Sequence, residues 1–210
     1  GSQVTFILQW KAKAPVYLSG SFNSWSSKTH PMLQISGTDI YHLSLKLPAG
    51  DHSYKFTDSS PTAQWITDPQ NPGFEYGPYG PNSTLQVGAT LKGLLRHHPD
   101  VTATLLKNKR DLFIYLPPSY HKDPLRRYPV LYMHDGQNLF DPNAVFGSWG
   151  VDAWIDKLSA TTSFDPPIIV GISNTSGRME EYTHVQDSYN GTKMGGQASD
   201  YADFLLREVK

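Results

Sequence analysis

The chain has 210 residues, a formal net charge of -1 and no cysteine, a length that allows one large domain or two ordinary ones, each with a core. A nearly neutral chain has no basic field to attract phosphate, so nucleic acid and anionic membranes are poor partners. The lack of cysteine excludes disulfide frameworks and thiolate metal sites, and no apolar run approaches the roughly 20 residues that a bilayer-spanning helix needs.

Residues 4–87 alternate apolar and polar side chains, which is the pattern of half-buried β-strands. Clusters of Gly, Pro, Ser and Asp separate these runs at residues 36–39, 48–51 and 58–61. Short strands with turns at this spacing predict a small, immunoglobulin-like β-sandwich. Residues 71–82 are rich in Gly, Pro and aromatic residues, and we expect them to be irregular.

The aromatic residues of this part are unusual for a plain sandwich, because Trp25 lies in a loop and Trp65 stands just before a turn. Lys55 alternates with apolar neighbours along its strand and should therefore point outward. An exposed aromatic ring can stack on the apolar face of a sugar ring, while side chains such as those of Lys55 and Asn82 bind its hydroxyl groups. The alternative is that the tryptophans only cap the sandwich or face the next domain, with Lys55 a solvated charge.

The first part resembles the carbohydrate-binding module found in glycogen-binding subunits and at the front of isoamylases and branching enzymes. Five blocks carry the resemblance, in the right order: 19–25 (SGSFNSW), 47–50 (LPAG), 54–56 (YKF), 65–69 (WITDP) and 82–87 (NSTLQV). The resemblance implies glucan contacts at Trp25, Lys55, Trp65 and Asn82. An isoamylase-type glycosidase would fit this part only, because the rest of the chain lacks the pattern that begins a (β/α)₈ barrel.

The second part predicts an α/β sheet. Residues 101–106 and 111–116 are β-rich and should form an antiparallel hairpin through residues 107–110. The apolar run 129–133 predicts a strand buried on both faces, and residues 166–172 predict a second one.

Two helices are expected beside these strands. The first follows Gly150 and should turn Val151, Trp154, Ile155 and Leu158 inward. The second begins near Ser199, with its inward residues at Tyr201, Phe204, Leu205 and Val209. Alternation of strands and helices after a hairpin indicates an α/β domain.

The polar loop 134–138 (HDGQN) follows the predicted strand 129–133. In open α/β sheets, ligands bind outside the carboxyl ends of the strands, so this loop is a candidate site. On the local sequence alone, a simple turn after the strand is the favoured interpretation of Asp135-Gly136.

This part resembles the beginning of the "putative esterase" family of α/β-hydrolases, which contains feruloyl and acetyl esterases, siderophore esterases and esterase D. The blocks that carry the resemblance lie at 115–120 (YLPPSY), 128–140 (YPVLYMHDGQNLF), 149–152 (WGVD) and 169–172 (IVGI), with Arg178, 181–182 (EY) and the helix from Tyr201. The resemblance implies serine ester hydrolysis without cofactor or metal. It places an oxyanion donor at Gly136 or Gln137, and Arg178 near the pocket mouth. There Arg178 would bind an acidic group or assist the oxyanion, unless it is only a surface residue.

The family's nucleophile stands in a Gly-x-Ser-x-Gly motif, and this motif is absent from the sequence. The family order places the nucleophile, the acid and the histidine after Lys210, and His134, His184 and Asp187 match no triad position. Three interpretations follow: a truncated fragment of an esterase, one piece of a split enzyme completed by another chain, or a non-catalytic glucan-binding protein with a relic esterase half.

We therefore predict a β-sandwich module over residues 1–90, a linker over 91–100 and an incomplete α/β-hydrolase domain over 101–210. The expected function is hydrolysis of carboxylic esters on acylated or feruloylated carbohydrate, with the chain inactive by itself. The strand at 129–133 would leave a bare apolar edge that a missing segment, a complementary chain or a swapped copy must cover. The compartment stays open, with a secreted or periplasmic location favoured over a cytoplasmic one.

Overall fold

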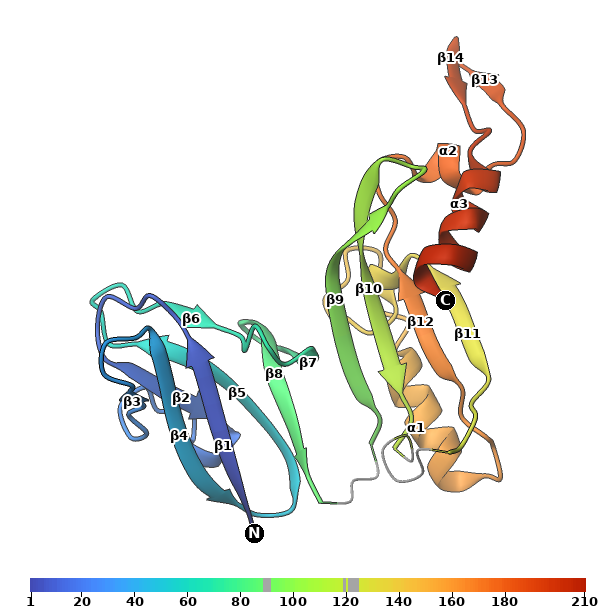
Figure 1. Cartoon of the computed structure of the whole chain (residues 1–210). Coiled ribbons are helices and arrows are strands. Elements are labelled where there is room, and N and C mark those ends of the chain that lie inside the picture. The colour runs from blue at the N-terminus through green and yellow to red at the C-terminus, as the bar shows by residue number, and fades with distance from the viewer. Residues whose placement is uncertain (89–91, 119, 121–124) are drawn as a thin grey trace. The chain divides into compact units, whose positions relative to one another are not determined.

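The structure is a computed structural model that describes residues 1–88, 92–118, 120 and 125–210 (Figure 1). Among these residues it forms two compact units: Gly1–Arg96 with Pro118 and Tyr120, and His97–Pro117 with residues 125–210. None of the helices in these described ranges is long and apolar enough to cross a membrane.

The first unit is a sandwich of two mainly antiparallel sheets, as the sequence predicts. One sheet has the strand order β1-β4-β3, and the other runs β7-β8-β5-β2, with β6 paired to β5 and the start of β9 paired to β7. The strands are β1 (Ser2–Gln9), β2 (Val16–Gly20), β3 (Leu33–Gln34), β4 (Ile40–Leu47), β5 (Gly50–Asp58), β6 (Trp65–Ile66), β7 (Gly73–Gly77) and β8 (Gly80–Val87). A short 3-10 helix, η1 (Ser21–Asn23), follows β2.

The core of the first unit lies between the two sheets. Alternation along β1 explains it, because Phe6 and Leu8 are buried whereas Ile7, between them, is 52% exposed. The buried cluster consists of Phe6, Leu8, Val16, Leu18, Met32, Tyr41, Leu47, Tyr54, Phe56 and Val87. It joins strands from both sheets into one apolar layer.

The prediction of irregular structure over residues 71–82 is wrong, because most of this segment forms the hairpin of β7 and β8. Gly77 and Gly80 face each other across the turn. Gly80 has a φ of +90°, a conformation that glycine adopts without strain. Glycines that usually weaken strands here close the turn between them.

The second unit has the strand order β11-β12-β10-β9, with β11 parallel and β10 antiparallel to β12. Its strands are β9 (Leu94–Ala103), β10 (Asn108–Leu116), β11 (Val130–His134), β12 (Ile168–Ile172) and the small hairpin β13 (Asp187–Tyr189) and β14 (Thr192–Met194). Its helices are the 3-10 turn η2 (Gly136–Asn138), α1 (Val151–Thr161), α2 (Arg178–Tyr182), α3 (Ala198–Phe204) and the π-helix η3 (Leu205–Val209). The predicted α/β class is confirmed.

The boundaries near the predicted linker differ from expectation. β9 begins at Leu94, inside the range 91–100, and Leu91 lies outside the described residues. The hairpin turn comes at residues 104–107, earlier than predicted, because Lys107 adopts a left-handed φ of 53° and β10 starts directly after it.

β11 forms an edge of the sheet, with β12 as its only strand neighbour among the described residues (Figure 1). Val130, Leu131 and Tyr132 are 44%, 47% and 37% exposed, so the prediction of a strand buried on both faces is wrong. The bare apolar edge expected beside it is present. On α1, Val151 and Ile155 of the face expected to turn inward are half-buried, but Trp154 and Leu158 are exposed. The helix meets the sheet through Asp156 as well, which accepts a hydrogen bond from the hydroxyl of the buried Tyr115.

Replacement of Phe56 by alanine should lower the free energy of unfolding by about 3–5 kcal/mol, because the ring is fully buried and would leave a cavity. Chemical denaturation measures this loss. Ile7→Ala, a change on the outer face of the same sandwich, should cost about 1 kcal/mol or less. Equal losses from the two changes would contradict the assigned core.

Candidate functional sites

The four residues predicted to contact glucan lie together in the first unit and line one pocket of about 740 Å³. Trp25 comes from the loop after η1, Lys55 from β5, Trp65 from β6 and Asn82 from β8. The pocket is thus assembled from four elements that are far apart in the sequence.

A strained loop presents Trp25 to this pocket. Ser24 and Trp25 have φ angles of 54° and 58°, a left-handed conformation that non-glycine residues seldom adopt. The side chain of Asn23 holds the loop, since its Oδ1 accepts the N–H of Gly20 at 2.9 Å and its Nδ2 donates to the carbonyl of Leu18 at 3.0 Å. Strain that the surrounding structure maintains in this way often marks a functional position.

Aromatic and proline side chains dominate the pocket walls. Trp25 is 36% exposed and Trp65 is 42% exposed, so both rings present an apolar surface to a ligand. Tyr76, Pro78 and Tyr79 of the β7–β8 hairpin complete the apolar part of the lining. Such surfaces suit the C–H faces of sugar rings.

The two polar residues are less accessible than the sequence suggests. Lys55 lies on the face opposite the core, as predicted, but is only 9% exposed. Its Nζ donates to the carbonyl of Tyr79 at 3.4 Å, and burial lowers the pKa of Lys55. Asn82 donates through Nδ2 to Oε1 of Glu75, also at 3.4 Å. The hairpin therefore covers Lys55, and the side chain of Asn82 is held within the hairpin.

Sequence reasoning missed Glu75, Tyr76 and Tyr79 as pocket residues. They belong to the segment predicted to be irregular, whose high aromatic content was the available signal.

A second group of predicted residues lies at the carboxyl end of β11. Gly136 and Gln137 begin η2, where the first backbone N–H groups have no partner within the helix. A Cβ on Gly136 would come within 2.6 Å of the carbonyl carbon of Gly171. Only glycine therefore allows the loop to lie this close to β12.

Asp135 connects this loop to the segment after β12. It has a left-handed φ of 56°, and its carboxylate accepts two hydrogen bonds from Arg178, both at 3.0 Å. Asn174 donates through Nδ2 to Asp135 at 2.8 Å and through its backbone N–H to Oε1 of Gln137 at 3.2 Å. These bonds bring Gly136, Gln137 and Arg178 into one cluster.

The charges in this cluster are paired with each other. The hydrogen bonds from Arg178 hold the pKa of Asp135 below its usual value, although burial opposes the shift. The guanidinium of Arg178 is engaged with Asp135, and its side chain remains 45% exposed. The contact it makes in the structure holds the loop, while a role at the mouth of an acyl pocket stays a prediction.

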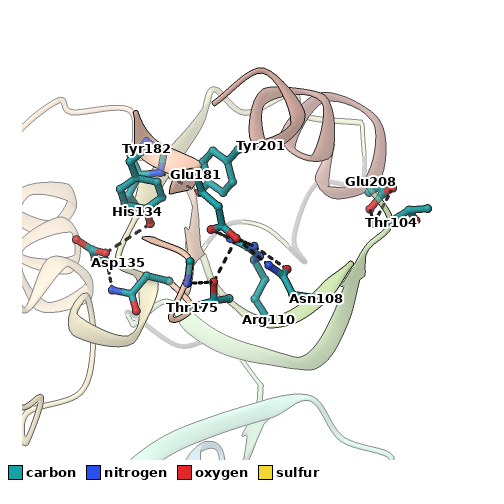
Figure 2. Close-up of polar contacts among 12 residues, drawn as sticks. Thr104, Asn108, Arg110, His134, Asp135, Thr175, Glu181, Tyr182, Tyr201 and Glu208 are labelled. Atoms are coloured by element: carbon teal, nitrogen blue, oxygen red, sulfur yellow. Dashed lines mark hydrogen bonds and ion pairs between the residues drawn. The ribbon is translucent and has the colours of Figure 1, made fainter. Parts of the chain in front are cut away.

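A buried ion pair holds α2, the helix that carries Arg178 (Figure 2). Arg110 on β10 donates to both carboxylate oxygens of Glu181 on α2, at 2.8 and 3.0 Å, and the two side chains are 0% and 1% exposed. Asn108 and Thr175 also donate to Glu181, at 2.7 and 3.2 Å. Burial alone would raise the pKa of Glu181, but these hydrogen bonds, with Arg110 first, lower it.

Aromatic rings join α3 to the same cluster. The hydroxyl of Tyr201 lies 2.9 Å from Nδ1 of His134, and the His134 ring centroid lies 4.7 Å from that of Tyr182. The guanidinium of Arg110 lies 5.3 Å from the ring centroid of Tyr201. His134 is thus part of the framework that positions the loop.

Across the ranges that the structure describes, no group of three or more His, Cys, Asp or Glu side chains could hold a metal ion.

Comparisons with known families match both parts of the chain. A family model described as "Putative esterase" matches residues 103–210. A model described as "Glycogen recognition site of AMP-activated protein kinase" matches residues 4–80. Both resemblances drawn from the sequence are therefore confirmed.

Several curated relatives match a short segment of the chain. An alpha-amylase of Niallia circulans is 51% identical over 58 residues, which are 27% of this chain and 4% of that protein. The 5'-AMP-activated protein kinase subunit beta-2 of Homo sapiens is 39% identical over 67 residues, which are 31% of this chain and 22% of that protein. The chain spans less than a quarter of either relative.

Many solved structures resemble the chain, among them three hydrolases. An IroE-like serine hydrolase from Shewanella oneidensis has 30% identity and a TM-score of 0.42, covering 55% of this chain and 36% of its own. The enterobactin esterase FES from Shigella flexneri has 18% identity and a TM-score of 0.41, and the match covers 99% of this chain and 58% of that protein's chain. A ferulic acid esterase has 20% identity and a TM-score of 0.36, and the match covers 58% of this chain and 42% of that protein's chain.

Replacement of Glu181 by glutamine should lower the free energy of unfolding by about 3–5 kcal/mol, because Arg110 would stay buried without its counter-charge. The pKa of Glu181 is lowered in the folded state, so its contribution is complete above the unfolded value and is lost as the pH falls through the folded value. Chemical denaturation should therefore show a smaller difference between wild type and variant below about pH 4.

The neighbouring change Glu180→Gln is the matched control, since the structure shows no ion pair for Glu180 among the described residues. A difference between wild type and Glu181→Gln that stays constant from pH 7 to acid pH would argue against the ion pair as its source.

Proposed function

Because this chain belongs to the "Putative esterase" family and carries a glycogen-recognition-type module, we propose that it is the sugar-binding and oxyanion-donating part of a serine carboxylic-ester hydrolase. Its substrate is an acylated or feruloylated carbohydrate. The observation that carries the proposal is the convergence of Trp25, Lys55, Trp65 and Asn82 on one pocket, in a chain that also holds an esterase loop.

The proposed chemistry is acyl transfer. A serine attacks the ester carbonyl, the alcohol of the sugar leaves, and water then hydrolyses the acyl-enzyme. The negative charge that develops on the carbonyl oxygen is stabilised by the N–H groups of Gly136 and Gln137. One such donor typically contributes about 3–4 kcal/mol to transition-state stabilisation, provided that it is positioned in advance. The bonds between Asp135, Asn174 and Arg178 supply that positioning.

The serine, the acid and the histidine of the proposed reaction come from outside these 210 residues, because no Gly-x-Ser-x-Gly motif occurs among them. We infer that a further segment, a complementary chain or a swapped copy adds a strand at the edge of β11. The exposed side chains of Val130, Leu131 and Tyr132 support this, since bare apolar edges attract another strand.

The absence of the nucleophile motif also favours a second candidate function. In this alternative, the chain is a glucan-binding protein whose esterase half no longer takes part in catalysis. Sugar binding is common to both candidates, and ester hydrolysis after addition of the complement separates them.

Sugar binding can be measured by affinity electrophoresis in gels that contain soluble glycogen. We expect glycogen to retard the wild-type chain, and the changes Trp25→Ala and Trp65→Ala to weaken binding about tenfold or more, because each removes one stacking surface. Trp154→Ala is the matched control, since Trp154 is exposed but lies on α1 of the second unit. No retardation of the wild type would overturn the sugar-binding proposal.

Association through β11 can be measured by sedimentation. We expect the chain by itself to self-associate and to hydrolyse no aryl ester, and Leu131→Lys to shift the population toward monomer, because an edge lysine opposes strand pairing. Leu33→Lys changes a similarly exposed leucine of the first unit and should leave association unchanged. A monomeric wild type would contradict the proposed role of this edge.

A further inference from the structure

We propose that the β7–β8 hairpin adds two residues to the sugar pocket, Tyr79 and Glu75, and that they make it selective for a neutral glycan over an acidic one. The inference rests on the proposed sugar-binding function of the same pocket. It concerns two side chains outside the family contacts at Trp25, Lys55, Trp65 and Asn82.

Tyr79 is placed as a third aromatic surface. Its side chain lines the pocket and yet is 93% exposed, so it contributes almost nothing to the core. Its backbone is fixed, because its carbonyl accepts a hydrogen bond from the buried Lys55. A large ring in solvent on an anchored backbone can stack on a ligand without rearrangement of the hairpin.

The hairpin itself has little freedom. Nδ2 of Asn82 lies 2.5 Å from the place that a Cβ of Gly77 would occupy, so glycine allows the side chain of Asn82 to cross here. Asn82 then donates to Glu75, which connects β8 to β7 on the pocket side. Through these contacts, the backbone at Tyr79 and the carboxylate of Glu75 keep fixed positions beside the pocket.

Glu75 brings a negative charge to the pocket. Its Oε1 accepts the bond from Asn82, and in the described part of the chain its Oε2 has no hydrogen-bond donor. A carboxylate accepts stronger hydrogen bonds from sugar hydroxyls than a neutral group does. The same charge repels the carboxylates of a uronic-acid polymer. The opposite charge of Lys55 is turned toward the carbonyl of Tyr79, so it offsets this repulsion only in part.

The test is affinity electrophoresis of the whole chain in glycogen and in polygalacturonate, a neutral and an acidic polysaccharide. We expect Tyr79→Ala to weaken glycogen binding about fivefold to tenfold, and Tyr79→Phe to keep it within about twofold, because stacking needs the ring and not the hydroxyl. Glu75→Gln should weaken glycogen binding about fivefold and strengthen retardation by polygalacturonate.

The controls are Leu33→Ala and Asp51→Asn, an exposed leucine and an exposed carboxylate of the same unit that do not line the pocket. Both should bind as the wild type does. Thermal unfolding of all variants should match the wild type, since the replaced side chains are exposed.

The outcomes separate this inference from the proposed function. Loss of glycogen binding in Trp25→Ala and Trp65→Ala, together with wild-type affinity in Tyr79→Ala and Glu75→Gln, would leave the sugar site in place and overturn the role of the hairpin. Equal retardation of the wild type by both polysaccharides would overturn the selectivity. A wild type that binds neither would overturn the sugar site, and this inference with it.

Discussion

The second unit depends on one buried charge pair, between Arg110 and Glu181. The helix α2 that carries Glu181 has five residues, too few to be stable by its own hydrogen bonds. The ion pair fixes this helix to β10 through Glu181, and Arg178, three residues earlier on the same helix, binds Asp135. The carboxylate of Asp135, in the HDGQN loop, is therefore positioned by a short helix that is itself positioned by a buried salt bridge.

Such a pair is costly to bury, so it is not by itself an efficient way to gain stability. What it provides here is a single orientation. Arg110 has a defined hydrogen-bond geometry toward Glu181, and its guanidinium also lies beside the rings of Tyr201 and Phe204. An apolar contact in its place would pack the helix without fixing its rotation about its own axis. The proposed chemistry needs that rotation, because Arg178 must reach Asp135 while Glu181 keeps its bonds to Arg110.

The sequence predicted those features that depend on short-range patterns. Alternation of apolar residues gave the sandwich, and the outward side of Lys55 followed from its place between two core residues. The sequence did not predict that Lys55 is covered, because the β7–β8 hairpin covers it. Gly77 and Gly80 close this hairpin, and the local propensity of glycine does not indicate strands there.

The HDGQN loop shows the same limit. The HDGQN motif predicted a candidate site that includes Gly136 and Gln137, and the family resemblance added Arg178. The bonds that join them run through Asp135 and Asn174, which are 39 positions apart, and no spacing rule connects two such residues. The prediction that β11 is buried was wrong for a related reason. A strand is buried on both faces only where other elements cover both faces of the sheet, and its own sequence does not state whether they are there.

The loop that presents Trp25 has an implication for the inheritance of sugar binding in such modules. Asn23 holds Ser24 and Trp25 in left-handed conformations that they would not otherwise adopt, and it does so without lining the pocket. A descendant could keep both tryptophans and still lose the ligand through a change at this one asparagine. Retention of Trp25 and Trp65 is therefore a weaker sign of a working sugar site than retention of both tryptophans together with Asn23, which orients the Trp25 loop.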